Sequence, residues 1–96
     1  MKRLLVVRRI VGQSMSPNLT PGRIVLGWNI GKPKVGELII FRHQGLDKIK
    51  RVSSIENDAF YVLGDNPDES TDSRSFGYIE RGQVVARVVW PLHLKS

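Results

Sequence analysis

The clearest structural signal in the sequence lies at residues 48–63, which read KIKRVSSIENDAFYVL. Two runs rich in alternating or β-branched apolar residues, at 48–54 and 59–63, flank a short polar stretch at 56–58 that is typical of a turn. This pattern predicts a β-hairpin. Similar short runs, bounded by Gly, Pro, Asn and Asp, lie on both sides of it, so the sequence predicts an all-β domain.

Four further strands are expected from the same pattern. They span residues 4–11, 23–28, 37–42 and 84–90. A helical turn is expected only within residues 14–20, where the prolines at 17 and 21 keep it short. Because 96 residues are too few for two self-sufficient cores, we expect a small single-domain, barrel-like β fold over residues 1–96, with little or no helix.

Composition excludes several classes of site. The chain has no cysteine, which excludes a disulfide scaffold, a thiol nucleophile and a thiolate zinc site. The two histidines, His43 and His93, do not form a metal-binding pair, so each is expected in a turn or at the surface, and no metal or cofactor is expected. The net charge of +6 is spread along the chain, which favours a solvated basic surface over a specific nucleic-acid site.

The N-terminal segment does not have the length of a signal or membrane sequence. Its apolar run covers residues 4–7 and ends at Arg8 and Arg9. A secretory signal needs roughly 7 to 15 apolar residues and a membrane helix about 20. The chain as written is therefore expected to be soluble, either cytoplasmic or peripheral at a membrane.

Two segments, residues 12–22 and 64–77, are longer than hairpin connections require and are expected to carry function. With thiol and histidine chemistry disfavoured, a serine activated by a lysine remains as a catalytic arrangement. The lysine would need its pKa lowered by roughly 2 to 3 units from about 10.4, usually by burial. Lys50 is the best-placed candidate, because it shares an expected strand face with Leu46 and Val52.

Four segments resemble, in order, the conserved boxes of the type I signal peptidase family. Residues 12–19 (GQSMSPNL) resemble the nucleophile box, residues 21–26 and 35–41 the strands that follow it, residues 48–52 (KIKRV) the general-base box, and residues 64–74 the final box. Together they cover about residues 10 to 90. The resemblance implies a serine endopeptidase with the β fold of the signal peptidase catalytic core.

The resemblance also implies roles for individual residues. Ser14 would be the nucleophile, with its backbone N–H as an oxyanion donor, and Lys50 would be the general base that later protonates the leaving amine. Ser70 would help to hold the lysine ammonium. Asp72 and Arg74 would form a charged pair that supports the final loop.

Three further positions follow from the same comparison. Asp65 and Arg51 would add a second charged contact. Gly12 stands where many relatives have a hydroxyl donor for the oxyanion, so a second backbone N–H would have to take its place. The residues that bind the substrate are not identified by the resemblance.

Signal peptidases usually have an N-terminal membrane anchor and often a further β subdomain, and this sequence resembles the catalytic core alone. Two subgroups fit such a chain. Residues 64–77 resemble the final box of nickel superoxide dismutase maturation proteases. A small signal peptidase that contacts the membrane peripherally, through its basic N-terminal strand and Trp28, also fits. The expected partner is a protein or peptide with an N-terminal signal or propeptide.

Two other functions are compatible with a small basic β domain. Self-cleaving SOS repressors share the Ser-Lys arrangement, but the Ala-Gly or Cys-Gly bond that they cut does not precede Ser14, so cleavage in trans is expected. The alternative is a non-catalytic small basic β-barrel that binds single-stranded nucleic acid. That alternative predicts salt-sensitive binding that survives Ser14→Ala, whereas the protease interpretation predicts loss of cleavage.

Overall fold

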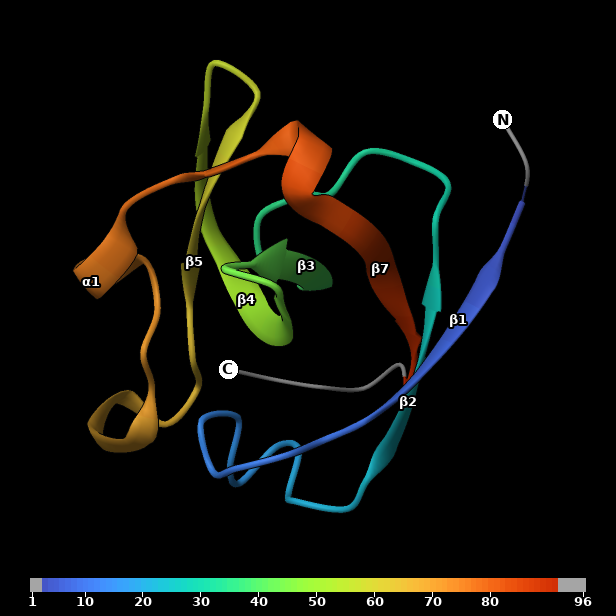
Figure 1. The fold of residues 1–96 in the computed structure, drawn as a ribbon, viewed down its shortest axis with the longest axis vertical. Helices are drawn as coiled ribbons and strands as arrows, with labels where there is room; N and C mark the ends of the chain where they lie inside the picture. Colours follow the sequence, from blue (N-terminus) through green and yellow to red (C-terminus); the bar gives the residue numbers. More distant parts are fainter. Residues whose placement is uncertain (1–2, 92–96) are drawn as a thin grey trace.

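A computed structural model describes residues 3–91 of the chain. Within this range the backbone forms one antiparallel sheet of seven strands. The strands are β1 (Leu5–Arg9), β2 (Ile24–Trp28), β3 (Leu38–His43), β4 (Leu46–Glu56), β5 (Ala59–Leu63), β6 (Ile79–Glu80) and β7 (Val84–Trp90). The helical elements are the 3-10 helices η1 (Pro67–Glu69) and η2 (Arg81–Gln83) and the single turn α1 (Ser73–Phe76). The predicted all-β class with little helix is confirmed (Figure 1).

The sheet is open and strongly curved. Its strand order is β1-β2-β7-β3-β4-β5-β6, and among the described residues the edge strands β1 and β6 do not pair with each other. Figure 1 shows β1 and β2 on one side of the curve and β4 and β5 on the other. An ion pair of 2.8 Å between Arg8 of β1 and Asp47 of β4 connects the two sides. The expected barrel-like form is therefore an open curved sheet.

The predicted hairpin is formed by β4 and β5. Its turn residues Asn57 and Asp58 adopt positive φ values of 48° and 65°, a conformation that Asn and Asp tolerate better than most residues. β4 extends beyond the predicted 48–54 segment at both ends, and its register with β5 shifts between Val52 and Ser54. A long β4 therefore spans the sheet from the turn after β3 to the hairpin tip.

Two hydrophobic clusters stabilise the fold. The first contains Ile39, Phe41, Val52, Phe60, Val62 and Ile79. The second contains Ile10, Met15, Leu19, Val25 and Leu38. β3 contributes Ile39 and Phe41 to the first cluster and Leu38 to the second, and Ile40 is also fully buried, so its first four residues do not alternate with exposed ones. Since burial of one large apolar side chain contributes about 1.5 to 3 kcal/mol, Met15 and Leu19 fix the segment between β1 and β2 firmly to the core.

The helical prediction was incomplete. Residues 14–20 form turns and no helix, but they include one turn with a helical hydrogen bond, from the N–H of Leu19 to the carbonyl of Met15 (2.8 Å). The helical turn α1, which was not predicted, lies in the polar loop, where the carboxylate of Asp72 caps its N-terminus. Within residues 3–91, no helix has the length and apolar character needed to cross a membrane.

Candidate active site

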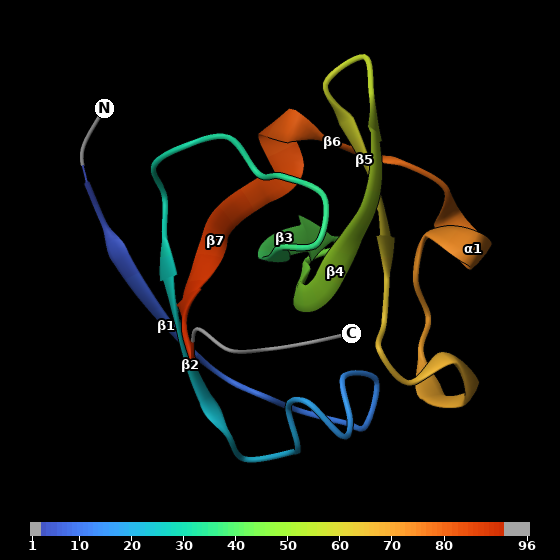
Figure 2. The same cartoon turned by 180° about the vertical axis from the view of Figure 1, so that it is seen from behind.

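Ser14 lies in the segment of residues 10–23 that connects β1 to β2. The buried side chains of Ile10 and Met15 hold this segment on both sides of the serine. Gly12 has a φ of +82°, which glycine adopts without the steric cost that a Cβ would cause. In Figure 2 the segment passes beneath the curved sheet toward the loop that follows β5.

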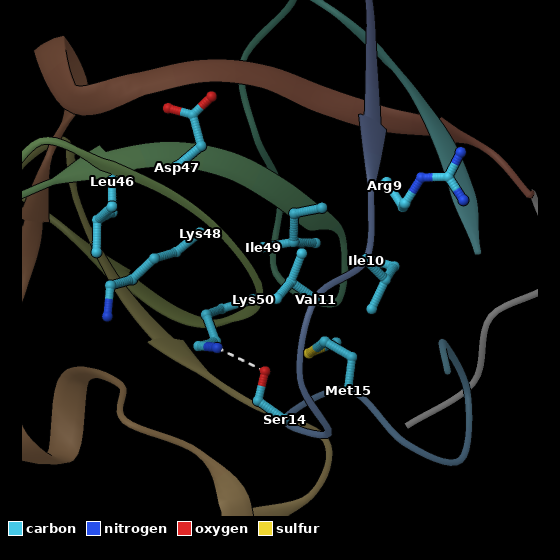
Figure 3. A pocket seen from close by; sticks show the side chains of 10 residues that line it. All are labelled: Arg9, Ile10, Val11, Ser14, Met15, Leu46, Asp47, Lys48, Ile49 and Lys50. Carbon is cyan, nitrogen blue, oxygen red and sulfur yellow. Dashed lines mark hydrogen bonds between the residues drawn. The ribbon is translucent and has the colours of Figure 1, made fainter. Parts of the chain in front are cut away.

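Lys50 lies in β4, between β3 and β5, and its side chain is only 6% exposed. Its Nζ atom lies 2.7 Å from Oγ of Ser14, and the two side chains point toward each other in Figure 3. The predicted pair is therefore in direct contact. Leu46, which was expected to share a strand face with Lys50, is 64% exposed. It is the first residue of β4 and lies next to the turn that joins β3 to β4.

The pKa of Lys50 is lowered from its ordinary value of 10.5 to about 8. Burial is the main cause, because it disfavours the charged ammonium. The positive charge of Lys48 lowers the pKa further, whereas the negative charge of Asp72 raises it. At pH 7 about a tenth of the molecules then carry a neutral Lys50 amine, which can accept the hydroxyl hydrogen of Ser14.

Asp72 organises the loop of residues 64–77. Its fully buried carboxylate accepts hydrogen bonds from Arg74 Nε (2.9 Å), from the hydroxyl of Ser70 (2.7 Å) and from the N–H of Gly64 (2.9 Å). Burial alone would raise the pKa of Asp72, but these donors hold it well below its usual range. The predicted Asp72 and Arg74 ion pair is therefore present and keeps the loop folded around a charged carboxylate.

Ser70 contacts Asp72 and not the lysine. Its hydroxyl donates to the carboxylate, and within residues 3–91 no hydrogen bond joins it to Lys50. Gly64 lies between Ser70 and the nucleophile segment. A Cβ at position 64 would lie 2.8 Å from the carbonyl oxygen of Ser14 and would overlap the Ser70 side chain, so only glycine fits this close approach.

A second ion pair lies on the other side of the same loop. Arg51 donates from Nε and Nη2 to the carboxylate of Asp65 at 2.9 and 2.7 Å, with side chains only 11% and 6% exposed. The amide of Asn18 donates to the same carboxylate (2.8 Å). The backbone N–H of Asn66 donates to the carbonyl of Ser14 (2.8 Å). The residues after β5 therefore hold the nucleophile segment at two points.

Ser14 and Lys50 line a cleft of about 400 Å³ (Figure 3). One wall is the first half of β4, and the other is the end of β1 with the residues that follow it. The lining residues are Arg9, Ile10, Val11, Ser14, Met15, Leu46, Asp47, Lys48, Ile49 and Lys50. A cleft with two strand-like walls fits an extended peptide, which can add its backbone hydrogen bonds to those of a strand.

Comparison with known families adds a finding that is independent of this geometry. The family described as signal peptidase, peptidase S26, matches residues 45–93. The chain belongs to this family. A search of curated proteins found no match. Membership in the S26 family supports a signal-peptidase-like protease in general, and the all-β fold is compatible with it.

The segment matched to the S26 family contains Lys50, Ser70, Asp72 and Arg74. Ser14 lies outside it, so the role of this serine depends on its motif and on its contact with Lys50. His43 is stacked on Phe76 with ring centres 4.3 Å apart, while His93 lies outside the described residues.

Sequence reasoning overlooked three residues around the pair. Asn18 and Asn66 connect the nucleophile segment to the loop after β5. The sequence shows that both are polar residues in long loops, which suggests a function but does not identify their partners. Lys48 lines the cleft two residues before Lys50. Its position could have been recognised, because residues two apart on a strand project to the same side.

Proposed function

We propose that this S26 family member is a serine endopeptidase that uses Ser14 and Lys50 to remove an N-terminal signal or propeptide from a protein substrate in trans. The observation that carries the proposal is the 2.7 Å distance between Lys50 Nζ and Ser14 Oγ. Lys50 is buried, and both residues line a cleft large enough for a peptide. A buried lysine with a lowered pKa next to a serine hydroxyl has the arrangement expected of a nucleophile and its base.

The reaction proceeds through an acyl-enzyme. Neutral Lys50 accepts the hydroxyl proton while Oγ of Ser14 forms a bond to the carbonyl carbon of the scissile peptide. The resulting ammonium gives this proton to the leaving amine as the C–N bond breaks, and the acyl group stays on Ser14. A water molecule then attacks the ester, Lys50 takes its proton, and that proton returns to Oγ as the acid product leaves.

The backbone N–H of Ser14 is the first oxyanion donor. Within residues 3–91 it donates to no protein acceptor, whereas the carbonyl of the same residue is occupied by Asn66. Gly12, two residues before this N–H, has a φ of +82° and carries no side-chain donor, so a second donor would have to be another backbone N–H. One such donor contributes about 3 kcal/mol to transition-state stabilisation.

The loop after β5 has a positioning role. The buried Asp72 receives hydrogen bonds from Ser70 and Gly64, and its negative charge acts on Lys50. Ser70 therefore influences the lysine through Asp72, while the ion pair of Asp65 with Arg51 holds the other side of the loop.

An exposed apolar surface supports peripheral membrane contact as one route to the substrate. Leu5 of β1 is paired with Trp28 of β2, and Leu26 of β2 is paired with Trp90 of β7. The three outer residues, Leu5, Trp28 and Trp90, are 57%, 40% and 47% exposed. Because β1 leads directly into the cleft wall, a membrane against this surface would bring a signal sequence close to Ser14.

Cleavage of a diverse peptide library tests the proposal. Wild-type protein, Ser14→Ala and Lys50→Ala are compared with lipid vesicles present and absent. Ser16→Ala and Lys34→Ala are matched controls, since they change a serine and a lysine outside the pair. Cleavage that is lost in both site variants and kept in both controls supports the proposal, and the cut sequences distinguish export signals from a maturation propeptide. Cleavage that persists in both site variants overturns it.

A further inference from the structure

The strand that carries Lys50 carries a second lysine on the same side. Side chains alternate along a strand, so Lys48 projects from β4 in the same direction as Lys50, and the two Cα atoms are about 7 Å apart. In Figure 3 the amine of Lys48 lies on the far side of Lys50 from Ser14. Lys48 is therefore directed away from the nucleophile, and its ammonium lies against Phe76 of the loop after β5.

The position of the Lys48 ammonium is defined by this aromatic contact. Its Nζ lies 5.7 Å from the centre of the Phe76 ring, within the range of a cation-π interaction. Phe76 is the last residue of α1 and is partly buried. Its ring packs against Phe41 and stacks on His43, which both belong to β3. A ring held by two neighbours has a fixed position, and so has the ammonium that lies against it.

The charge of Lys48 is not cancelled by the protein. Within residues 3–91 no carboxylate forms an ion pair with its ammonium, and the ring of Phe76 is neutral. The adjacent residue Asp47 projects to the other side of β4 and is engaged by Arg8 (2.8 Å) and by Arg42 (2.9 Å). A full positive charge therefore stays close to Lys50.

Lys50 has polar or charged neighbours from three parts of the chain. The hydroxyl of Ser14 lies 2.7 Å from its Nζ, Asp72 acts on it from the loop after β5, and Lys48 acts from its own strand. The residue paired with Lys50 on β3 is Ile39, which carries no charge. Burial lowers the pKa of Lys50 most, the charge of Lys48 lowers it further, and the charge of Asp72 raises it.

We propose that Phe76 is a positioning residue for the reaction: its ring holds the Lys48 ammonium where a second positive charge favours the neutral, proton-accepting amine of Lys50. A cationic neighbour favours a neutral amine because two like charges at short distance repel each other. The inference rests on the proposed function, in which Lys50 is the base. It gives α1 an effect on the lysine opposite in sign to that of the Asp72 carboxylate at its N-terminus.

The test follows the protonation of Lys50 both directly and through catalysis. NMR titration of isotope-labelled lysine side chains gives the midpoint for Lys50, whose signal is assigned by its loss in Lys50→Met. Because this signal belongs to Lys50 itself, titration of His43 is not mistaken for it. The pH profile of kcat/KM gives a second midpoint for a peptide that the protein cleaves.

Variants of Phe76 test the role of the ring. Phe76→Leu keeps an apolar side chain but removes the ring, so we expect it to raise both midpoints by about 0.2 to 0.5 pH unit as the ammonium moves away. Phe76→Tyr keeps the ring and should leave both midpoints unchanged. Tyr78→Leu is the matched control, because the Tyr78 ring contacts Tyr61 and not a lysine. Equal midpoints in Phe76→Leu and wild type would overturn the inference.

A double-mutant comparison assigns the effect to Lys48. Lys48→Met removes the charge and should raise the midpoints by itself. Phe76→Leu should then add no further shift, because the charge that the ring positions has gone. A shift from Phe76→Leu that persists in the Lys48→Met protein would mean that the ring acts on Lys50 through packing alone, and would overturn the inference.

The two readouts separate this inference from the proposed function. The expected shifts in the NMR midpoint without any cleavage overturn the peptidase assignment and support the role of Phe76. Ser14-dependent cleavage with the same midpoint in wild type, Phe76→Leu and Lys48→Met overturns the role of Phe76 alone. The expected shifts in both readouts support both.

Discussion

The backbone N–H of Asn66 donates a 2.8 Å hydrogen bond to the carbonyl oxygen of Ser14. These residues lie on different segments, one after β5 and the other between β1 and β2. The bond fixes the backbone at the serine. The position of the nucleophile relative to Lys50 therefore depends on the loop of residues 64–77 as well as on the serine segment.

Gly64→Ala should reduce cleavage strongly. The added Cβ would lie 2.8 Å from the carbonyl oxygen of Ser14 and would overlap Ser70, so the two segments must move apart. We expect a loss of at least about tenfold in kcat/KM, and a loss of about 1 to 3 kcal/mol in the free energy of unfolding. Gly82→Ala is the matched control, because a Cβ there has no neighbour within 4 Å. An unchanged kcat/KM in Gly64→Ala would contradict the positioning role of the loop.

The rate of cleavage should rise with pH. The active form of Lys50 is the neutral amine, so kcat/KM increases about tenfold per pH unit below the pKa and levels off above about pH 8. Lys48→Met should move the midpoint to higher pH, because Lys48 lowers the pKa of Lys50. Rate profiles between pH 5.5 and 10 (about nine points) measure both effects. A flat wild-type profile would exclude a titrating lysine as the base.

Lys50→Met should stabilise the protein while it abolishes cleavage. The pKa of Lys50 is about 8 in the folded chain and near 10.5 when unfolded, so protonating the buried amine destabilises the fold at pH below 8. This cost disappears as the pH rises from 8 to 10.5. We expect a gain of about 2 to 3 kcal/mol at pH 7 and a much smaller one at pH 10, measured by urea unfolding. An equal effect at both pH values would mean that the lysine pKa is not lowered.

Asp72→Asn should destabilise the loop and the fold. The charged carboxylate accepts hydrogen bonds from four donor groups. Asparagine has an NH₂ group in place of one carboxylate oxygen, and this NH₂ would face hydrogen-bond donors from which it cannot accept. We expect a loss of about 2 to 4 kcal/mol in the free energy of unfolding at pH 7. The matched control is Asp68→Asn, at an exposed position of η1.

The pH dependence of this effect has a defined sign. The pKa of Asp72 is lowered in the folded protein, so its stabilising contribution is complete above the unfolded value near 4 and is lost as the pH falls below it. The difference in stability between wild type and Asp72→Asn should therefore shrink in acid. A difference that stays constant from pH 7 to pH 3 would contradict a charged, hydrogen-bonded carboxylate at this position.

Local sequence patterns predicted the hairpin and every strand except the two-residue β6, because alternation and turn residues act over a few neighbouring positions. The contact between Ser14 and Lys50 was predicted only through the family resemblance, since it depends on how the open sheet curves. α1 was missed because its four residues carry no helical periodicity, and its start depends on the buried carboxylate of Asp72. Ser70 was assigned to the lysine, but the fold directs its hydroxyl to Asp72.

The most direct test of the central claim is a double-mutant cycle on kcat/KM for a peptide that the wild type cleaves. Ser14→Ala and Lys50→Ala are measured singly and together, with Ser16→Ala as the control. If the two residues act as one unit, each single substitution lowers kcat/KM by about a thousandfold or more and the double variant is no worse than either single one. A Lys50→Ala variant with wild-type activity, or losses that multiply in the double variant, would contradict the account.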